Sequence, residues 1–355
     1  MELSIDIEKT LPGFSLKLKL DCTQGIIGIL GASGSGKSML LNCVAGLIRP
    51  DKGHISLDGR TFFDSAKKIN LSPQSRKTGI LFQNYALFPH MTIRDNIAFG
   101  LDGLDKKEKS ERVNRLLERF RIADFAGRYP AQISGGQQQR AALARALAVE
   151  PDILLLDEPF SALDQYLKQQ LMKDMLETLR DYNGCTLFVT HNMEEAFRMC
   201  DRLAIISGGR IEASGSKQDI FRRPPTCASA VITGCKNIKE AQRVSDHEAF
   251  IPDWGITLVT CMKIEQDKGY AGVRANHVRP AEIGDTGNCF PAWIADEIEA
   301  PFTTTLYLKF GAKPSSKDDF HIQCEIKNDH RANIGDVSQP LSIFVDPQHV
   351  FFTER

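Results

Sequence analysis

Glycines, a lysine and serines follow one another closely at residues 31–38, which read GASGSGKS. The stretch matches the pattern G-x-x-x-x-G-K-[ST] and lies between an aliphatic run, GIIGIL, and an apolar run with helix-forming composition. In that context backbone N–H groups surround the phosphates of a nucleotide, the lysine neutralises their charge, and the last serine binds Mg²⁺. The sequence therefore predicts a nucleotide site made by Gly31, Ala32, Ser33, Gly34, Ser35, Gly36, Lys37 and Ser38.

Two acidic residues follow a second apolar run, in the sequence ILLLDEP at residues 153–159. Such a run is typical of a buried central strand, so Asp157 and Glu158 are expected at its carboxyl end. Asp157 is then placed to hold Mg²⁺ together with Ser38, and Glu158 to polarise the attacking water. Two solvated acids at the end of a strand are the alternative. The nucleotide motif in the same chain favours the catalytic interpretation.

Three further polar residues are candidates for sensing the terminal phosphate. Gln83 and His191 each follow a strand-like run, and Asp164 lies in SALD just beyond the acidic pair. The carboxyl ends of parallel strands meet at one edge of a sheet, where an amide or imidazole can hydrogen-bond water or phosphate. We expect catalytic roles for Gln83 and His191, with Gln83 also contacting Mg²⁺. An ordinary loop histidine is the alternative for His191.

A second glycine-rich stretch, ISGGQ at residues 133–137, precedes a run rich in Ala, Leu and Arg. Ser134 is a typical helix N-cap, and the bare backbone of Gly135 and Gly136 at a helix start is suited to an anion. On these residues alone, a capped helix and a phosphate site are equally good interpretations.

The elements that must position these residues follow two patterns. From residue 1 to about 230, short aliphatic runs alternate with helical stretches, including 106–121 and 165–182, which predicts an α/β fold with a parallel sheet. Residues 2–21 alternate polar and apolar, as expected for an antiparallel hairpin at a sheet edge. Beyond Pro225, short alternating segments predict a small β-barrel or sandwich, with domains at 1–235 and 236–355.

The composition limits the kinds of protein this can be. The 355 residues carry 44 Lys and Arg against 45 Asp and Glu, so the chain has no excess of positive charge of the kind that binds nucleic acid. The start lacks a signal-like apolar segment, and the apolar runs are shorter than the ~18 residues that cross a bilayer. The nine cysteines have no metal-type spacing. We therefore expect a cytosolic protein with reduced thiols that neither is exported nor crosses a membrane.

Taken in order, these motifs resemble those of the ATP-binding subunits of ABC transporters. Residues 31–38 resemble Walker A, 133–137 the signature, 153–159 Walker B and 161–164 the D-loop, while Gln83 and His191 match the Q-loop and switch histidine. The resemblance covers residues 1 to about 230, and the signature has isoleucine where leucine is usual. It implies the ABC ATPase fold with a helical subdomain at about 84–150, ATP and Mg²⁺ as ligands, and ATP hydrolysis coupled to transport.

The resemblance also implies partners. In this family two ATPase domains pair head to tail, so Ser134, Gly135, Gly136 and Gln137 would contact the ATP held by a second copy. A homodimer at the cytoplasmic face of the membrane follows, bound to permease subunits through the segment after Gln83 and acting indirectly with an extracytoplasmic binding protein. Candidates for lining the permease groove, unless they belong to the core of the helical subdomain, are Tyr85, Leu87, Phe88 and Met91.

The carboxyl-terminal region and the cargo rest on the same resemblance. Residues 272–283, GVRANHVRPAEI, look like a strand of the TOBE or Mop-like barrel, which is expected at about 290–355. Residues 11–38 and 87–101 most resemble molybdate importers, with sulfate, ferric iron and polyamine importers as alternatives. Phe14 is a candidate for stacking on adenine or for the core. The hydroxyls of residues 303–305 are a candidate regulatory oxyanion site, or simply part of a Thr-rich strand.

Two other classes compete with a transporter ATPase. A non-transport ABC ATPase that acts on DNA or ribosomes would need a long coiled coil or two cassettes, and the sequence has neither. A P-loop kinase or metabolic NTPase leaves ISGGQ before a helix unexplained.

Overall fold

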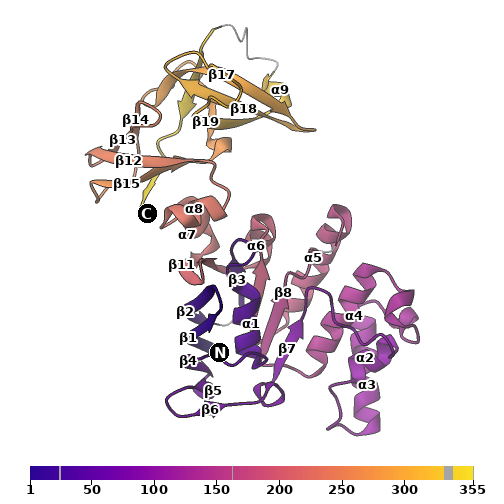
Figure 1. Cartoon of the computed structure of the whole chain (residues 1–355). Coiled ribbons are helices and arrows are strands. Elements are labelled where there is room, and N and C mark those ends of the chain that lie inside the picture. Colours follow the sequence, from indigo (N-terminus) through magenta and orange to yellow (C-terminus); the bar gives the residue numbers. More distant parts are fainter. Residues whose placement is uncertain (24, 162, 332–338, 355) are drawn as a thin grey trace. The chain divides into compact units, whose positions relative to one another are not determined.

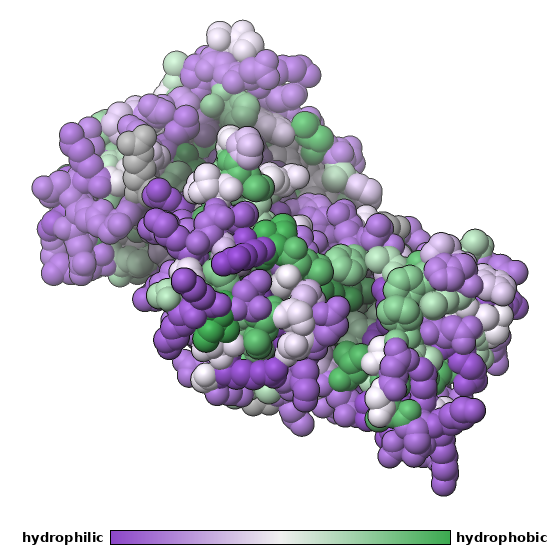
Figure 2. Space-filling view, turned by 60° about the horizontal axis from the view of Figure 1, so that its bottom comes forward, coloured by the Kyte–Doolittle hydropathy of each residue, from purple (hydrophilic) through white to green (hydrophobic). Residues whose placement is uncertain are grey.

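The computed structural model describes residues 1–23, 25–161, 163–331 and 339–354. The chain divides into two compact units, Met1–Lys217 and Gln218–Arg355 (Figure 1). Within the described residues, no helix is both long enough and apolar enough to cross a lipid bilayer. On the face shown in Figure 2, hydrophilic residues surround separate hydrophobic patches.

The first unit is built on one large sheet, whose described strands lie in the order β6-β5-β4-β1-β2-β11-β10-β3-β9-β8-β7. Neighbouring strands from β10 to β7 are parallel, which confirms the predicted parallel sheet. Their side chains are largely buried, as the apolar runs require. The parallel strands are β3 (Gly25–Leu30), β7 (Thr78–Leu81), β8 (Ile153–Asp157), β9 (Cys185–Thr190) and β10 (Arg202–Ser207).

The antiparallel edge is confirmed and is larger than the predicted hairpin. β1 (Glu2–Leu11) and β2 (Phe14–Thr23) form that hairpin in continuous register. Further strands extend the sheet beyond β1 because β4 pairs with it and β5 and β6 follow. The remaining strands of this sheet are β4 (Lys52–Leu57), β5 (Arg60–Asp64), β6 (Ile69–Asn70) and β11 (Arg210–Ser216).

Helices cover the sheet and form a separate group at one end of it (Figure 1). α1 packs against β8 and β9, and α6 against β3 and β9. α2, α3 and α4 pack on one another within the range expected for a helical subdomain. Helices α3 and α5 each stop two residues before the predicted ends at 121 and 182. The helices are α1 (Lys37–Ala45), α2 (Ile93–Ala98), α3 (Lys106–Arg119), α4 (Gly135–Ala148), α5 (Gln165–Arg180) and α6 (Met193–Met199).

A buried arginine anchors the end of α1. The Arg76 side chain is 0% exposed and donates to the carbonyl oxygens of Cys43 at 2.8 Å and Val44 at 2.9 Å. Its other donors reach the Leu71 carbonyl and Asn70 Oδ1, both at 3.0 Å. A cation thus binds carbonyls of the last turn of α1 and complements the helix dipole, while the Cys43 carbonyl also accepts from the Gly46 N–H at 3.2 Å.

The second unit is rich in β-structure, as predicted. Two five-stranded antiparallel sheets, in the orders β14-β13-β12-β15-β21 and β16-β20-β17-β18-β19, share one apolar core. The second sheet nearly closes, because Cys324 Sγ on β19 donates to the Val278 carbonyl on β16 at 3.0 Å. The strands of the two sheets are β12 (Asn237–Ser245), β13 (Glu248–Ile251), β14 (Ile256–Val259), β15 (Lys268–Val273), β16 (Val278–Pro280), β17 (Cys289–Glu299), β18 (Thr303–Phe310), β19 (Ile322–Lys327), β20 (Leu341–Val345) and β21 (Phe351–Thr353).

The division between the units falls before the predicted boundary near residue 235. α7 (Lys217–Arg222) and α8 (Cys227–Ile232) precede the first strand of the second unit. Arg274 of that unit donates to the carbonyl oxygens of Phe221, which lies within α7, and Thr233, the residue that ends α8. The Cys227 N–H also bonds to the Glu354 carbonyl at 3.0 Å. These helices therefore fold with the β-rich unit. The second sheet likewise starts at β16, ahead of residue 290.

Candidate active site

One cleft of about 820 Å³ gathers residues from most of the predicted motifs. The loop between β3 and α1 supplies Ala32, Ser33, Gly34, Gly36, Lys37 and Ser38, and the β1–β2 turn supplies Leu11, Pro12 and Phe14. Gln83, Glu158 and His191 reach it from beyond the carboxyl ends of β7, β8 and β9. The structure thus brings together, at one edge of the parallel sheet, the strand-end residues that the sequence pattern predicts there.

The loop at residues 31–36 has a backbone that side chains would block. A Cβ on Gly31 would lie 2.3 Å from the Ile206 carbonyl oxygen. Gly36, the N-cap of α1, has φ of 105°, and a Cβ there would lie 2.5 Å from Leu16 Cδ1. Both positions therefore require glycine. They leave the start of α1 open to an anion.

Lys37 holds a buried charge inside this loop. Its side-chain nitrogen donates to the carbonyl oxygens of Gly31 at 2.9 Å and Ala32 at 2.8 Å, and the residue is 5% exposed. Burial lowers the pKa of Lys37, while the carboxylates of Glu158 and Asp157 partly offset that shift. Phosphate oxygens are stronger acceptors than these carbonyls, so the lysine is poised to exchange partners when a polyphosphate enters.

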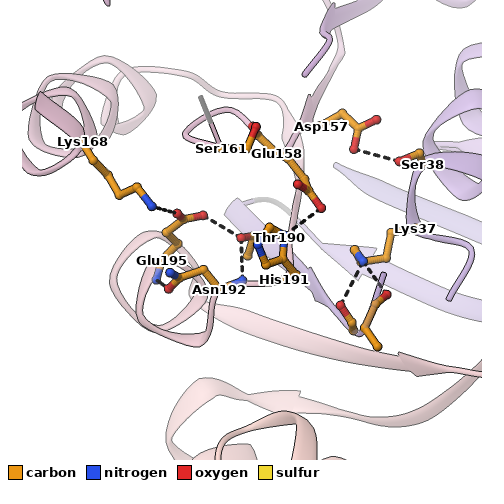
Figure 3. A network of polar contacts seen from close by, with 12 residues as sticks. Lys37, Ser38, Asp157, Glu158, Ser161, Lys168, Thr190, His191, Asn192 and Glu195 are labelled. Carbon is orange, nitrogen blue, oxygen red and sulfur yellow. Dashed lines mark hydrogen bonds and ion pairs between the residues drawn. The ribbon is translucent and has the colours of Figure 1, made fainter. Parts of the chain in front are cut away.

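Oxygen ligands for a divalent cation lie beside the lysine. Ser38 Oγ donates to Asp157 Oδ1 at 3.1 Å (Figure 3). Burial raises the pKa of Asp157, and the charge of Glu158 adds to the rise, whereas Ser38 and Lys37 oppose it. A carboxylate and a hydroxyl in this arrangement suit a hard cation that keeps waters and binds phosphates. Gln83 lies in the same cleft, so the expected Mg²⁺ residues fit that ion.

Glu158 and His191 form a direct pair. His191 Nδ1 and Glu158 Oε1 lie 3.0 Å apart (Figure 3). Glu158 adopts a left-handed backbone with φ of 44°, unusual outside glycine. Its N–H donates to the Val189 carbonyl at 3.0 Å, and its carbonyl accepts from Ser161 Oγ at 3.0 Å. Local strain of this kind persists where the surroundings fix it, and here it accompanies a carboxylate turned into the cleft.

A polar network behind His191 is absent from the sequence predictions. Thr190 Oγ1 donates to Glu195 Oε2 at 2.6 Å, and Lys168 Nζ donates to Glu195 Oε1 at 2.8 Å. Asn192 caps α6 by accepting from the N–H groups of Glu194 and Glu195. The only local signal is Asn192 followed by two acids, a typical helix start. The ion pair joins residues 27 positions apart and could not be read from spacing.

The signature residues lie away from this cleft. Ser134 is the N-cap of α4, and its Oγ accepts from the Gln137 N–H at 3.4 Å while Gln137 Oε1 accepts from the Ser134 N–H at 2.9 Å. The predicted cap is thus confirmed as a capping box. Gly135, Gly136 and Gln137 form the first turn. Asp164 caps α5 by accepting from the Leu167 N–H at 3.0 Å, while Ala162 of the same motif lies outside the described residues.

Two aromatic residues were candidates for contacts with other molecules: Phe14 with adenine and Tyr85 with a permease. Phe14 lines the cleft and also packs partly buried against the apolar core, so adenine stacking and a core role both keep a structural basis. Tyr85 is only 5% exposed, so it belongs to the core and does not line a permease groove. Its backbone carbonyl accepts from Arg145 at 2.9 Å. Leu87, Phe88 and Met91 are half-buried.

The threonines at 303–305 occupy a regular strand of the second unit. Thr304 is 3% exposed, and its Oγ1 donates to Asn328 Oδ1 at 2.9 Å. Its neighbours are half-buried on the strand β18. The middle hydroxyl already has a protein partner, which favours the strand interpretation.

The fold and the cleft define a class of protein: an α/β sheet that carries a loop able to bind the phosphates of a nucleotide. Comparisons with known proteins agree with this class. The family model described as "ABC transporter" matches residues 15–161. The molybdenum import ATP-binding protein ModC of Paramagnetospirillum magneticum is 39% identical over 62% of this chain and 61% of its own length. A probable sulfate/thiosulfate import ATP-binding protein CysA of Chlorella vulgaris is 44% identical over 62% of this chain and 92% of its own.

A solved structure gives the same result. This chain is similar to a solved dimeric ATP-binding cassette, MJ0796, in a post-hydrolysis state bound to ADP and Pi. The two structures superpose with a TM-score of 0.52 at 27% sequence identity, over 61% of this chain and 99% of the cassette. The chain belongs to the family of ABC transporter ATP-binding proteins. It spans about three fifths of the length of the first curated relatives it matches.

Proposed function

We propose that this chain is the ATP-hydrolysing subunit of an ABC importer. The observation that carries the proposal is one cleft that combines the buried Lys37, the Ser38–Asp157 pair and the Glu158–His191 pair. Lys37 supplies charge neutralisation, the Ser38–Asp157 pair supplies oxygen ligands for a metal, and the Glu158–His191 pair supplies the orientation of water, which are three requirements of phosphoryl transfer. The names of the relatives, which describe ATP-binding import proteins, support the same function.

The residues divide the reaction among themselves. On ATP binding, the side chain of Lys37 exchanges the carbonyls of Gly31 and Ala32 for phosphate oxygens. Ser38, Asp157 and Gln83 would hold Mg²⁺, which would neutralise charge on the phosphates. Glu158 orients and deprotonates the attacking water, and the hydrogen bond from His191 fixes that carboxylate.

A second copy completes the site. Ser134 and Gly135 are exposed at the start of α4, away from their own cleft. Together with Gly136 and Gln137 they form a helix start that suits contact with the ATP of another subunit. Asp164 lies at the neighbouring start of α5. We therefore propose a head-to-tail homodimer, which the dimeric solved relative supports.

The cargo is proposed to be an oxyanion, most specifically molybdate, with sulfate as the direct competitor and ferric iron or a polyamine as further alternatives. Relatives named for molybdenum and for sulfate both support the oxyanion class. The homodimer would sit at the cytoplasmic face of the membrane and contact permease subunits through Leu87, Phe88 and Met91. An extracytoplasmic binding protein acts through the permease. The second unit is proposed to contain a TOBE or Mop-like barrel at about residues 290–355.

Turnover with a reconstituted transporter tests the cargo. ATP hydrolysis is measured with the genomically neighbouring permease and its binding protein, loaded in turn with molybdate, tungstate or sulfate. Stimulation by molybdate and tungstate but not sulfate is expected. Stimulation by sulfate alone would reassign the cargo to sulfate, and hydrolysis that none of the three loaded proteins stimulates would rule out these oxyanions as the cargo. No hydrolysis under any of these conditions would contradict the ATPase function.

A further inference from the structure

The loop that carries His191 is held by a charged pair between two helices. Glu195 of α6 has a side chain that is only 6% exposed. Its Oε1 accepts from Lys168 Nζ of α5 at 2.8 Å, and its Oε2 accepts from Thr190 Oγ1 at the end of β9 at 2.6 Å (Figure 3). One carboxylate therefore ties helix α5 to the strand end next to His191.

His191 is fixed through its neighbours in the chain. Thr190, 1% exposed, accepts from the Asn192 N–H at 3.0 Å in addition to donating to Glu195. Asn192 is held in turn as the cap of α6. The His191 side chain is 57% exposed, yet it meets Glu158 at 3.0 Å. Because so exposed a ring has little packing of its own, the rigid backbone on both sides is what sets its direction.

The same helix α5 contacts the signature segment. A Cβ on Gly136 would lie 3.1 Å from Leu167 Cδ2 and 3.3 Å from Leu171 Cδ1, so α4 begins tightly against α5. Lys168 follows Leu167 directly. A continuous series of contacts therefore runs from the start of α4 to α5 and, through the ion pair, to Glu195 and the His191 loop.

We propose that Lys168, Glu195 and Thr190 are positioning residues that orient His191 toward Glu158 and link that orientation to the signature segment. The inference rests on the proposed function, in which residues 134–137 bind the ATP of a second copy. That binding is then registered at His191 of the same chain. Breaking the buried pair by removing Lys168 leaves the Glu195 charge uncompensated and frees the loop.

Matched variants separate positioning from general damage. Thr190→Val removes the hydroxyl at constant shape, and Thr190→Ser keeps it. Lys168→Met removes the cation and Lys168→Arg keeps it, while Lys173→Met changes an exposed lysine on the same helix. We expect Thr190→Val and Lys168→Met to lower kcat for ATP at least about tenfold with KM within about twofold, because misplacement acts on the chemical step. The Ser, Arg and Lys173 variants should stay near wild type.

Nitrogen NMR of histidine-labelled protein gives a readout that does not need activity. The His191 signals are assigned by their loss in His191→Gln, and Nδ1 should show a hydrogen-bonded shift in wild type that moves toward that of a solvated ring in Lys168→Met. Unchanged His191 signals in that variant, or equal kcat losses in the Arg and Ser variants, would overturn the proposal. A wild-type chain that hydrolyses no ATP with its permease and loaded binding protein would refute the proposed function instead, and the NMR comparison would still decide the positioning role.

Discussion

Replacing Arg76 tests whether the fold holds the phosphate-binding helix from its far end. The guanidinium is 0% exposed and makes four hydrogen bonds, three to carbonyl oxygens and one to Asn70 Oδ1. In Arg76→Met the buried carbonyl of Val44 loses this partner, at about 1–3 kcal/mol, whereas the carbonyl of Cys43 keeps the N–H of Gly46 and Asn70 is exposed to solvent. The cost of burying the cation disappears at the same time. A hydrogen bond from a charged donor contributes about 1.5–3 kcal/mol, so losing the two bonds to α1 should leave a net loss of about 3–5 kcal/mol once the cost of burying the cation is taken off.

The loss should appear in thermal unfolding of the first unit. At about 2–4 °C per kcal/mol for a unit of this size, the Tm of Arg76→Met should fall by roughly 6–20 °C. Arg76→Lys should recover only part of this, because an ammonium cannot reach acceptors on both sides as a planar fork does. Arg115→Met, an exposed site on α3, is the control. A loss below about 1 kcal/mol, or one equal to that of the control, would refute the reasoning.

Two further predictions concern the acidic pair. Glu158→Gln should lower ATP turnover by a factor of about 10²–10⁴ while ATP still binds, because a general base is lost. The control in the same turnover assay is Glu194→Gln, which changes an exposed carboxylate paired with Arg198. Near-normal turnover of Glu158→Gln would contradict the assignment. Asp157→Asn should abolish Mg²⁺-dependent hydrolysis yet raise the Tm of the nucleotide-free protein by a few degrees, for a gain of about 1 kcal/mol. The folded state raises the pKa of Asp157, so this carboxyl favours folding below its ordinary pKa and opposes it once the pH rises through the folded value. The Tm difference should therefore be present at pH 7 and vanish near pH ~4; a difference independent of pH would contradict it.

The sequence predicts those parts of the protein that depend on patterns of neighbouring residues. The phosphate-binding loop and the strands β3, β8 and β9 follow from apolar runs ended by special residues, and the Ser134 cap from the residues beside it. These signals need no knowledge of distant contacts. They also place Gln83, Glu158 and His191 at one sheet edge, because all parallel strands end there.

What the sequence conceals depends on contacts between distant residues. No local pattern predicts that Arg76 binds carbonyl oxygens 32 and 33 positions away in the sequence. Nor does any local pattern predict that Lys168 pairs with Glu195. β17 is hidden because Pro291 lies within it and an irregularity between Ile294 and Asp296 breaks the two-residue period. β12 is mostly exposed, so its alternation is weak. Tyr85 was a groove candidate by type, and only packing shows it to be core.

Complementation between two inactive chains tests the shared site most directly. Chains with Lys37→Met and with Ser134→Arg carry different tags, are co-expressed, and are purified as the mixed dimer by both tags. In a head-to-tail dimer one site then has both defects and the other has none, so we expect the mixed dimer to hydrolyse ATP although each single-variant dimer does not. A mixed dimer as inactive as both parents, with all three folded by thermal unfolding, would contradict a site completed by the signature of a second copy.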